Sequence, residues 1–84
     1  MDRYLVISPH TQQDCVKALK NIVFAGNVTR WDFGCKDGEH TGWVVVEAEN
    51  KEQAMLAVPT LERPMARVIK IVRFTPDDIK SMHG

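Results

Sequence analysis

Asp37 and Gly38 constrain the fold of this 84-residue chain more than any other feature of its sequence. An Asp-Gly pair accepts the positive φ angles of a two-residue hairpin turn, and apolar residues lie on both sides of it. In the register that such a turn sets, Cys35 faces His40, with Cβ atoms about 5 Å apart on one face of the sheet. The predicted hairpin therefore places a thiol beside an imidazole.

Periodic apolar residues and two capping patterns predict the elements around this hairpin. Thr11 to Asp14 and Asn50 to Gln53 each have the form of a helix N-cap followed by an acidic or amide residue three positions on. The expected elements are strands over residues 4–8, 28–35, 43–48 and 66–74, a helix from residue 11 that ends at Gly26-Asn27, a helix over residues 50–58, and a last helical turn from Thr75.

The order β-α-β-β-α-β is that of the ferredoxin-like plan, so we expect a single α+β domain over residues 1–84. In this plan both helices cover one face of a four-stranded antiparallel sheet of order 4-1-3-2. Val44 and Val46 point to one face of the sheet, whereas Trp43 and Val45 point to the other. Because two helices cover only one face, we expect the face with Trp43 and Val45 to be a homodimer interface.

Charge and cysteine usage limit the partners and the compartment. Eleven basic and eleven acidic residues give zero net charge, which favours neither nucleic acid nor a membrane surface as a partner. The N-terminus carries only a short apolar run, too short for a signal peptide, so we expect a cytoplasmic protein. In that reducing compartment Cys15 and Cys35 are expected to be thiols, ligands or redox groups and not a permanent disulfide.

Two stretches of the sequence resemble a known group of proteins. They are GWVVVEAENKEQA at residues 42–54 and VPTLERP at residues 58–64. Together with the element order, they resemble the dimeric α/β-barrel superfamily, and within it the muconolactone isomerase-like proteins and small nickel-binding proteins. The resemblance implies a homodimer with two sheets packed face to face. It also implies a range of activities that includes isomerases, haem- or cofactor-free monooxygenases and metal binders.

Four potential metal ligands are expected at one edge of the predicted sheet. His10 follows the first strand, Cys15 opens the first helix, Cys35 closes the second strand and His40 opens the third. In this topology these four points meet, because the first and second strands run parallel and the third runs against them. The spacing is symmetrical, His-x4-Cys and then Cys-x4-His, and this set of nitrogen and sulfur ligands suits zinc, copper or nickel. The sequence thus predicts binding of a transition metal or a small ligand at this edge.

Alternative interpretations exist for these residues. Each cysteine alone is more often a small core residue than a ligand. Cys15 near a helix N-terminus could instead be a reactive thiol with Cys35 as its resolving partner.

An enzymatic alternative uses the opposite face of the sheet. Arg30, Asp32 and Glu47 are expected on the face of Trp43. There they could do acid–base work for a cofactor-independent isomerase or monooxygenase that acts in the cleft between sheet and partner. They could equally form the polar rim of the dimer interface.

Overall fold

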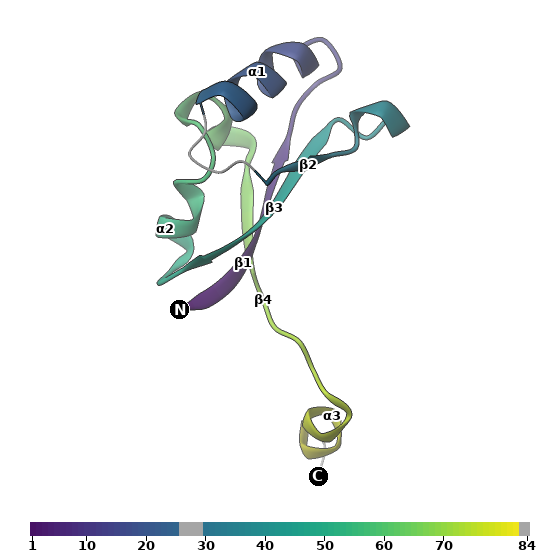
Figure 1. Ribbon diagram of the computed structural model, residues 1–84, viewed down its shortest axis with the longest axis vertical. Coiled ribbons are helices and arrows are strands. Elements are labelled where there is room, and N and C mark those ends of the chain that lie inside the picture. The colour runs from purple at the N-terminus through teal and green to yellow at the C-terminus, as the bar shows by residue number, and fades with distance from the viewer. Residues whose placement is uncertain (26–29, 83–84) are drawn as a thin grey trace.

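The computed structural model describes residues 1–25 and 30–82 and has the expected α+β class. The predicted helix end at Gly26-Asn27 and the predicted strand start at Val28 lie outside the described residues. In chain order the elements are β1 (Asp2–Pro9), α1 (Cys15–Ala25), β2 (Asp32–Phe33), the 3-10 turn η1 (Cys35–Asp37), β3 (Thr41–Ala48), α2 (Lys51–Met55), the 3-10 helix η2 (Thr60–Met65), β4 (Arg67–Ile71) and α3 (Pro76–Met82) (Figure 1).

The four strands form one open antiparallel sheet with the order β2-β3-β1-β4. Read from the other edge, this is the order 4-1-3-2 expected from the sequence. At the centre, Val6 of β1 lies opposite Val44 of β3 and Val68 of β4. α2 packs on β1, β3 and β4, whereas α1 lies mainly against η2 near one end of the sheet. A ferredoxin-like fold, which needs both helices across the sheet, and its dimeric packing stay predictions.

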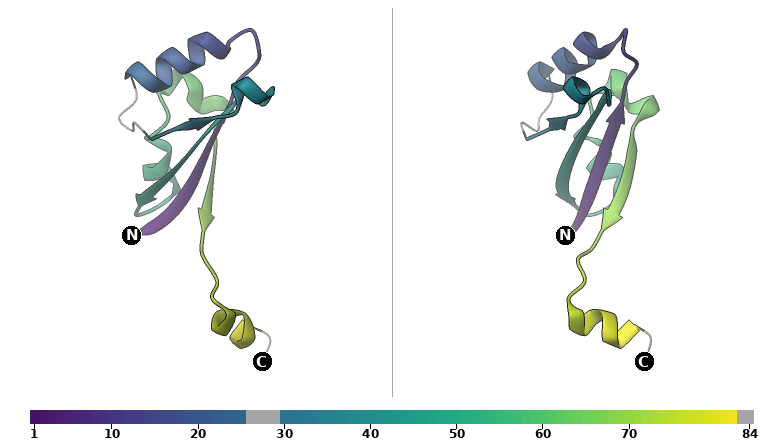
Figure 2. Two further views of the ribbon diagram at one scale, coloured as in Figure 1. Left: turned by 45° about the vertical axis from the view of Figure 1, so that its right-hand side comes forward. Right: turned by 90° about the vertical axis from the view of Figure 1, so that its right-hand side faces the viewer.

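The two faces of the sheet differ in how well they are covered. On the covered face, Tyr4, Val6 and Val44 are buried together with Ala54 of α2 and Val58, and they form the core. Figure 2 shows the helices α1 and α2 with η2 on this side of the sheet. The other side is called the open face below. Its apolar residues are half-buried or exposed, and they are Leu5, Ile7, Trp43, Val45, Ile69 and Ile71.

The hairpin between β2 and β3 is longer than predicted. The two strands keep the expected register, with Asp32 opposite Trp43, but their ladder ends at Phe33. Beyond it, Gly34 accepts a hydrogen bond of 3.0 Å from the Glu39 backbone N–H and so closes a four-residue loop.

The prediction of a two-residue turn is therefore wrong. The physical reason lies in the backbone angles of the loop. Asp37 has a negative φ, because residues 35–37 form the 3-10 turn. Gly38 alone takes the left-handed conformation, with a φ of 83°. Cys35 and His40 are consequently neighbours across a loop and not a cross-strand pair.

The chain leaves the body of the domain after β4. The last strand was expected to run to residue 74, but it ends at Ile71, opposite Arg3, because β1 begins only one residue before this pair, at Asp2. The expected last helical turn is confirmed as α3. Its N-terminus is capped reciprocally, since the Asp78 N–H donates to Thr75 Oγ1 and the Thr75 N–H donates to Asp78 Oδ2. No helix in residues 1–25 or 30–82 is long and apolar enough to cross a membrane.

Candidate metal centre

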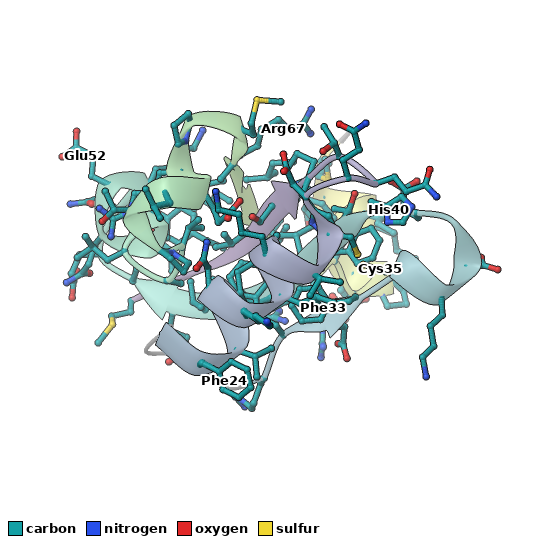
Figure 3. The ribbon with its side chains drawn as sticks, turned by 90° about the horizontal axis from the view of Figure 1, so that it is seen from above. Phe24, Phe33, Cys35, His40, Glu52 and Arg67 are labelled. Atoms are coloured by element: carbon teal, nitrogen blue, oxygen red, sulfur yellow. The ribbon has the colours of Figure 1, made fainter. Side chains whose placement is uncertain are left out.

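The four predicted ligands come together at the end of the sheet where β1 stops and β3 starts. His10 follows β1, and its backbone N–H donates a hydrogen bond of 2.9 Å to the His40 carbonyl just before β3. Cys15 is the first residue of α1 and Cys35 is the first residue of η1. Figure 3 shows Cys35 and His40 on the same side of the molecule. The predicted convergence at this edge is confirmed.

Local hydrogen bonds return the chain to this point after β1. The Asp14 backbone N–H donates to Thr11 Oγ1 at 3.1 Å, and the same N–H also donates to the Thr11 carbonyl. This turn reverses the chain between His10 and α1, so that Cys15 comes back towards the end of β1. The predicted cap is thus present, although the helix itself begins at Cys15 and not at Thr11.

Gly34 shapes the second half of the site. A Cβ atom at this position would lie 2.9 Å from the Glu39 carbonyl oxygen and 3.0 Å from the Trp43 ring. Any larger residue would push the loop away from Trp43 and would displace Cys35, the next residue in the chain. Glycine is therefore needed here for close packing and not for a special backbone angle.

The ligand atoms of the four residues all lie within 4.8 Å of one another. Cys35 Sγ lies 3.3 Å from His10 Nε2, and the centroids of the two imidazole rings are 5.8 Å apart. In a tetrahedral zinc site with bonds of about 2.3 Å to sulfur and about 2.0 Å to nitrogen, sulfur and nitrogen ligands are about 3.5 Å apart. The Cys35–His10 contact, at 3.3 Å, is close to this length, and a separation of 4.8 Å would have to shorten by about 1 Å on binding. The cluster therefore fits a tetrahedral ion.

Burial shifts the pKa values of two residues of the cluster, His10 and Cys35. Burial lowers the pKa of His10, and the neighbouring charge of His40 lowers it further, whereas Glu62 and Asp14 act in the opposite direction. Burial also raises the pKa of the Cys35 thiol, with the adjacent Cys15 thiol as the second cause. A raised thiol pKa disfavours the thiolate of Cys35, which the redox alternative takes as the resolving partner of Cys15. A bound cation would reverse this by favouring the thiolate.

Two imidazole nitrogens have no partner among the described residues. They are Nδ1 of His10 and Nδ1 of His40, and both are buried. Buried polar nitrogens are normally paired. Because His10 approaches Cys35 through Nε2, its Nδ1 is not the nitrogen that an ion bound with Cys35 would take, whereas Nδ1 of His40 is open to such an ion. All four ligand side chains are half-buried, and the set supplies two sulfur and two nitrogen donors. Such a set would fill the coordination of a tetrahedral ion and would leave no position for a substrate, as in structural metal sites.

The other residues predicted to be functional lie away from this cluster, on the open face. Trp43 and Val45 point to it, as expected, and Arg30 and Asp32 line a hollow there of about 350 Å³ together with them. Glu47 also lies on this face, and in the register of β1 with β3 it stands opposite Arg3. Their shared face is as predicted, but their roles at an interface or in catalysis stay predictions.

The structure also shows a cavity beside the cluster that sequence patterns did not predict. It has a volume of about 440 Å³, and His10 and Asp14 line it on one side, with Leu61, Glu62 and Met65 of η2 on the other. A hydrogen bond of 3.1 Å from Asn21 Nδ2 to Glu62 Oε1 holds η2 against α1. No local sequence pattern predicts this contact, because it joins residues far apart in the chain.

Comparison with family models, with curated proteins and with solved structures finds no match for this chain. The resemblance to the dimeric α/β-barrel superfamily therefore stays a prediction.

Proposed function

We propose that this protein binds one transition-metal ion through His10, Cys15, Cys35 and His40, and that zinc is the ion that suits the site best. The observation that carries the proposal is the mutual approach of all four ligand atoms within 4.8 Å. Two thiolates and two imidazoles in a tetrahedral arrangement are a typical zinc set, and copper(I) and nickel are the ions to compare with it.

The role of the ion would be structural, because it would join segments that the chain packs only weakly. α1 rests mainly on η2, and its residues Val16, Val23 and Phe24 are exposed. Domains of this size have little surplus stability, and a structural metal is a common remedy. An ion held by Cys15 and Cys35 would tie the start of α1 to the β2–β3 loop. Its binding free energy would add to the stability of the fold.

The test is thermal unfolding of the protein with and without zinc, copper(I) or nickel. It is done on the natural chain and on the variants Cys35→Ser and His40→Ala. Lys36→Ala is the matched control, since Lys36 is the exposed neighbour of Cys35. We expect zinc to raise the unfolding midpoint of the natural chain and of Lys36→Ala, and to raise that of the two ligand variants much less. Failure of every ion to raise the natural midpoint would contradict the proposal.

A homodimer packed through the face of Trp43 and Val45 is a second part of the proposal. It is supported by the apolar residues of the open face, among them Leu5 and Ile69, which nothing in the described chain covers. Such an apolar surface is typical of an interface.

The alternative function is a cofactor-independent isomerase or monooxygenase that uses the hollow with Arg30 and Asp32. This hollow is open and lies on the face opposite the core, so a partner subunit would have to close it. An enzyme of that kind needs no stoichiometric metal, so a chain that no ion stabilises would favour it.

A further inference from the structure

The segment from Val72 to Met82, called the C-terminal arm below, projects from the body of the protein (Figures 1 and 2). It consists of an extended stretch over residues 72–75 and the helix α3. In the part of the chain that the structure describes, α3 has no extensive contact with another helix or with a strand. The arm accounts for the elongated shape, with extents of 50 × 28 × 20 Å.

The arm carries apolar side chains that its own domain leaves in water. Val72 and Phe74 are 61% and 56% exposed, and Ile79 and Met82 are each 55% exposed. Ile79 and Met82 are three positions apart and share one side of α3. A seven-residue helix is marginal in water even when it is capped, so α3 needs a packing partner. The pattern of one apolar side and a capped N-terminus is that of a docking helix.

The arm lies beyond the sheet of its own chain. β4 pairs with β1 as far as the Arg3–Ile71 pair, and β1 begins only one residue earlier, at Asp2. Residues 72–75 reach at most about 14 Å past this end, and α3 adds about 10 Å. The arm is thus long enough to lie across a neighbouring copy.

Charge favours a second copy of this chain as the neighbour. The chain has zero net charge, so two copies do not repel each other over long distances. The first turn of α3 contains Asp77 and Asp78, and the open face carries Arg3, Arg30 and Arg67 against Asp32 and Glu47, an excess of one positive charge. Carboxylates at the helix start can therefore meet guanidinium groups at the edge of the partner's open face.

We propose that the C-terminal arm packs its apolar side against the open face of a second copy, so that each chain of a homodimer clasps the other. The arm covers apolar residues of the partner's face such as Leu5, Val45 and Ile69, while Phe74, Ile79 and Met82 leave the solvent. This inference includes the homodimer proposed above and is independent of the metal site, which lies at the other end of the sheet.

The test mixes two variants of the full chain. The arm variant carries Ile79→Asp and Met82→Asp, and the face variant carries Val45→Glu. Val45 is chosen because, unlike Trp43, it is not the residue that packs on Gly34 beside Cys35. Lys80→Gln is the control, since Lys80 is an exposed polar residue of the same helix. Sedimentation equilibrium measures the dimer dissociation constant of each protein and of the equimolar mixture.

We expect the natural chain and Lys80→Gln to dimerise alike, and each apolar-site variant to have a dissociation constant raised at least about tenfold. The mixture should dimerise more tightly than either variant alone. The reason is that a mixed dimer restores one natural arm on one natural face. A pair of variants whose arms fold back on their own sheets would show no such rescue.

Each other outcome overturns the proposal. An arm variant that dimerises like the natural chain shows that the arm is not part of the interface, although the homodimer itself would stand. Absence of rescue in the mixture shows an intramolecular arm. A natural chain that is monomeric overturns both the arm contact and the homodimer, whereas zinc stabilisation measured on the same samples reports separately on the metal site.

Discussion

The two ends of the sheet contrast in what the folded chain leaves without a partner. At the end near His10, two segments remote in sequence, residues 10–15 and 35–40, meet and leave nitrogen and sulfur donors in a half-buried cluster. At the other end a single segment departs and leaves Phe74 and Ile79 in water. A single ion can complete the first end, because its donors already point to one place. The second end needs a surface that covers its apolar side chains. Substitutions at the two ends should therefore have separate effects.

Loss of one thiolate should weaken metal binding and leave the homodimer unchanged. Cys35→Ser replaces a soft thiolate by a hydroxyl, so zinc affinity should fall by about 100-fold or more. Competition with a coloured chelator measures the affinity, and the dimer dissociation constant should not change. Because burial raises the pKa of Cys35, the ion must displace a proton, and zinc affinity should rise with pH in the natural chain. An affinity that Cys35→Ser leaves within threefold of the natural value would contradict this prediction.

A charge on the open face should weaken the homodimer and leave metal binding unchanged. Val45→Glu places a carboxylate in the proposed interface, and we expect the dimer dissociation constant to rise about tenfold or more. Zinc affinity should stay as in the natural chain, because Val45 lies on β3 beyond the loop that holds Cys35. Sedimentation and chelator competition on one preparation give both numbers. An equal loss of zinc affinity and of dimer affinity would show that the metal site and the interface are coupled.

The loop that carries Cys35 should tolerate asparagine but not valine at its left-handed position. Gly38 has a φ of 83°, and a Cβ atom there would meet nothing within 4 Å, so any cost comes from the backbone angle alone. Gly38→Val should lower the free energy of unfolding by about 1–2 kcal/mol. Gly38→Asn should lower it by less, since asparagine enters this region more easily. Urea unfolding of the metal-free chains measures both, and equal values for the two variants would refute the angle as the cause.

The smallest effect concerns the cap of α3. Hydrogen bonds from the Thr75 backbone N–H and hydroxyl lower the pKa of Asp78. A lowered pKa in the folded state gives a contribution that is present above the ordinary carboxyl pKa of about 3.9 and is lost as the pH falls through the folded value. The helical circular dichroism of the natural chain should therefore decrease slightly on acidification. Asp78→Asn should show a smaller decrease, and an identical decrease would mean that other carboxylates cause it.

How far the sequence predicted the structure depends on how local each signal is. The caps at Asn50 and Thr75 were predictable, because each is a pattern within four residues, and both are present. The β2–β3 register was also predictable, but the turn was not. Its 3-10 geometry depends on Gly34, which has to pack against Trp43 across the loop.

The candidate site was predictable because topology alone brings strand ends together. His10, Cys15, Cys35 and His40 meet although Cys35 and His40 are not the cross-strand pair that the sequence suggested. No periodic pattern in the sequence predicts the contact of η2 with α1 or the projecting arm. Both depend on which surfaces remain after the sheet has formed, and residues 72–74 look like a continued strand in sequence.

X-ray absorption at the zinc edge tests the metal site most directly. The protein is loaded with one equivalent of zinc and then freed of loosely bound ion. We expect one zinc per chain, with two sulfur ligands at about 2.3 Å and two nitrogen ligands at about 2.0 Å. In Cys35→Ser one sulfur should be lost. A first shell of oxygen ligands only, or a protein that retains no zinc, would contradict the assignment of this cluster as a metal centre.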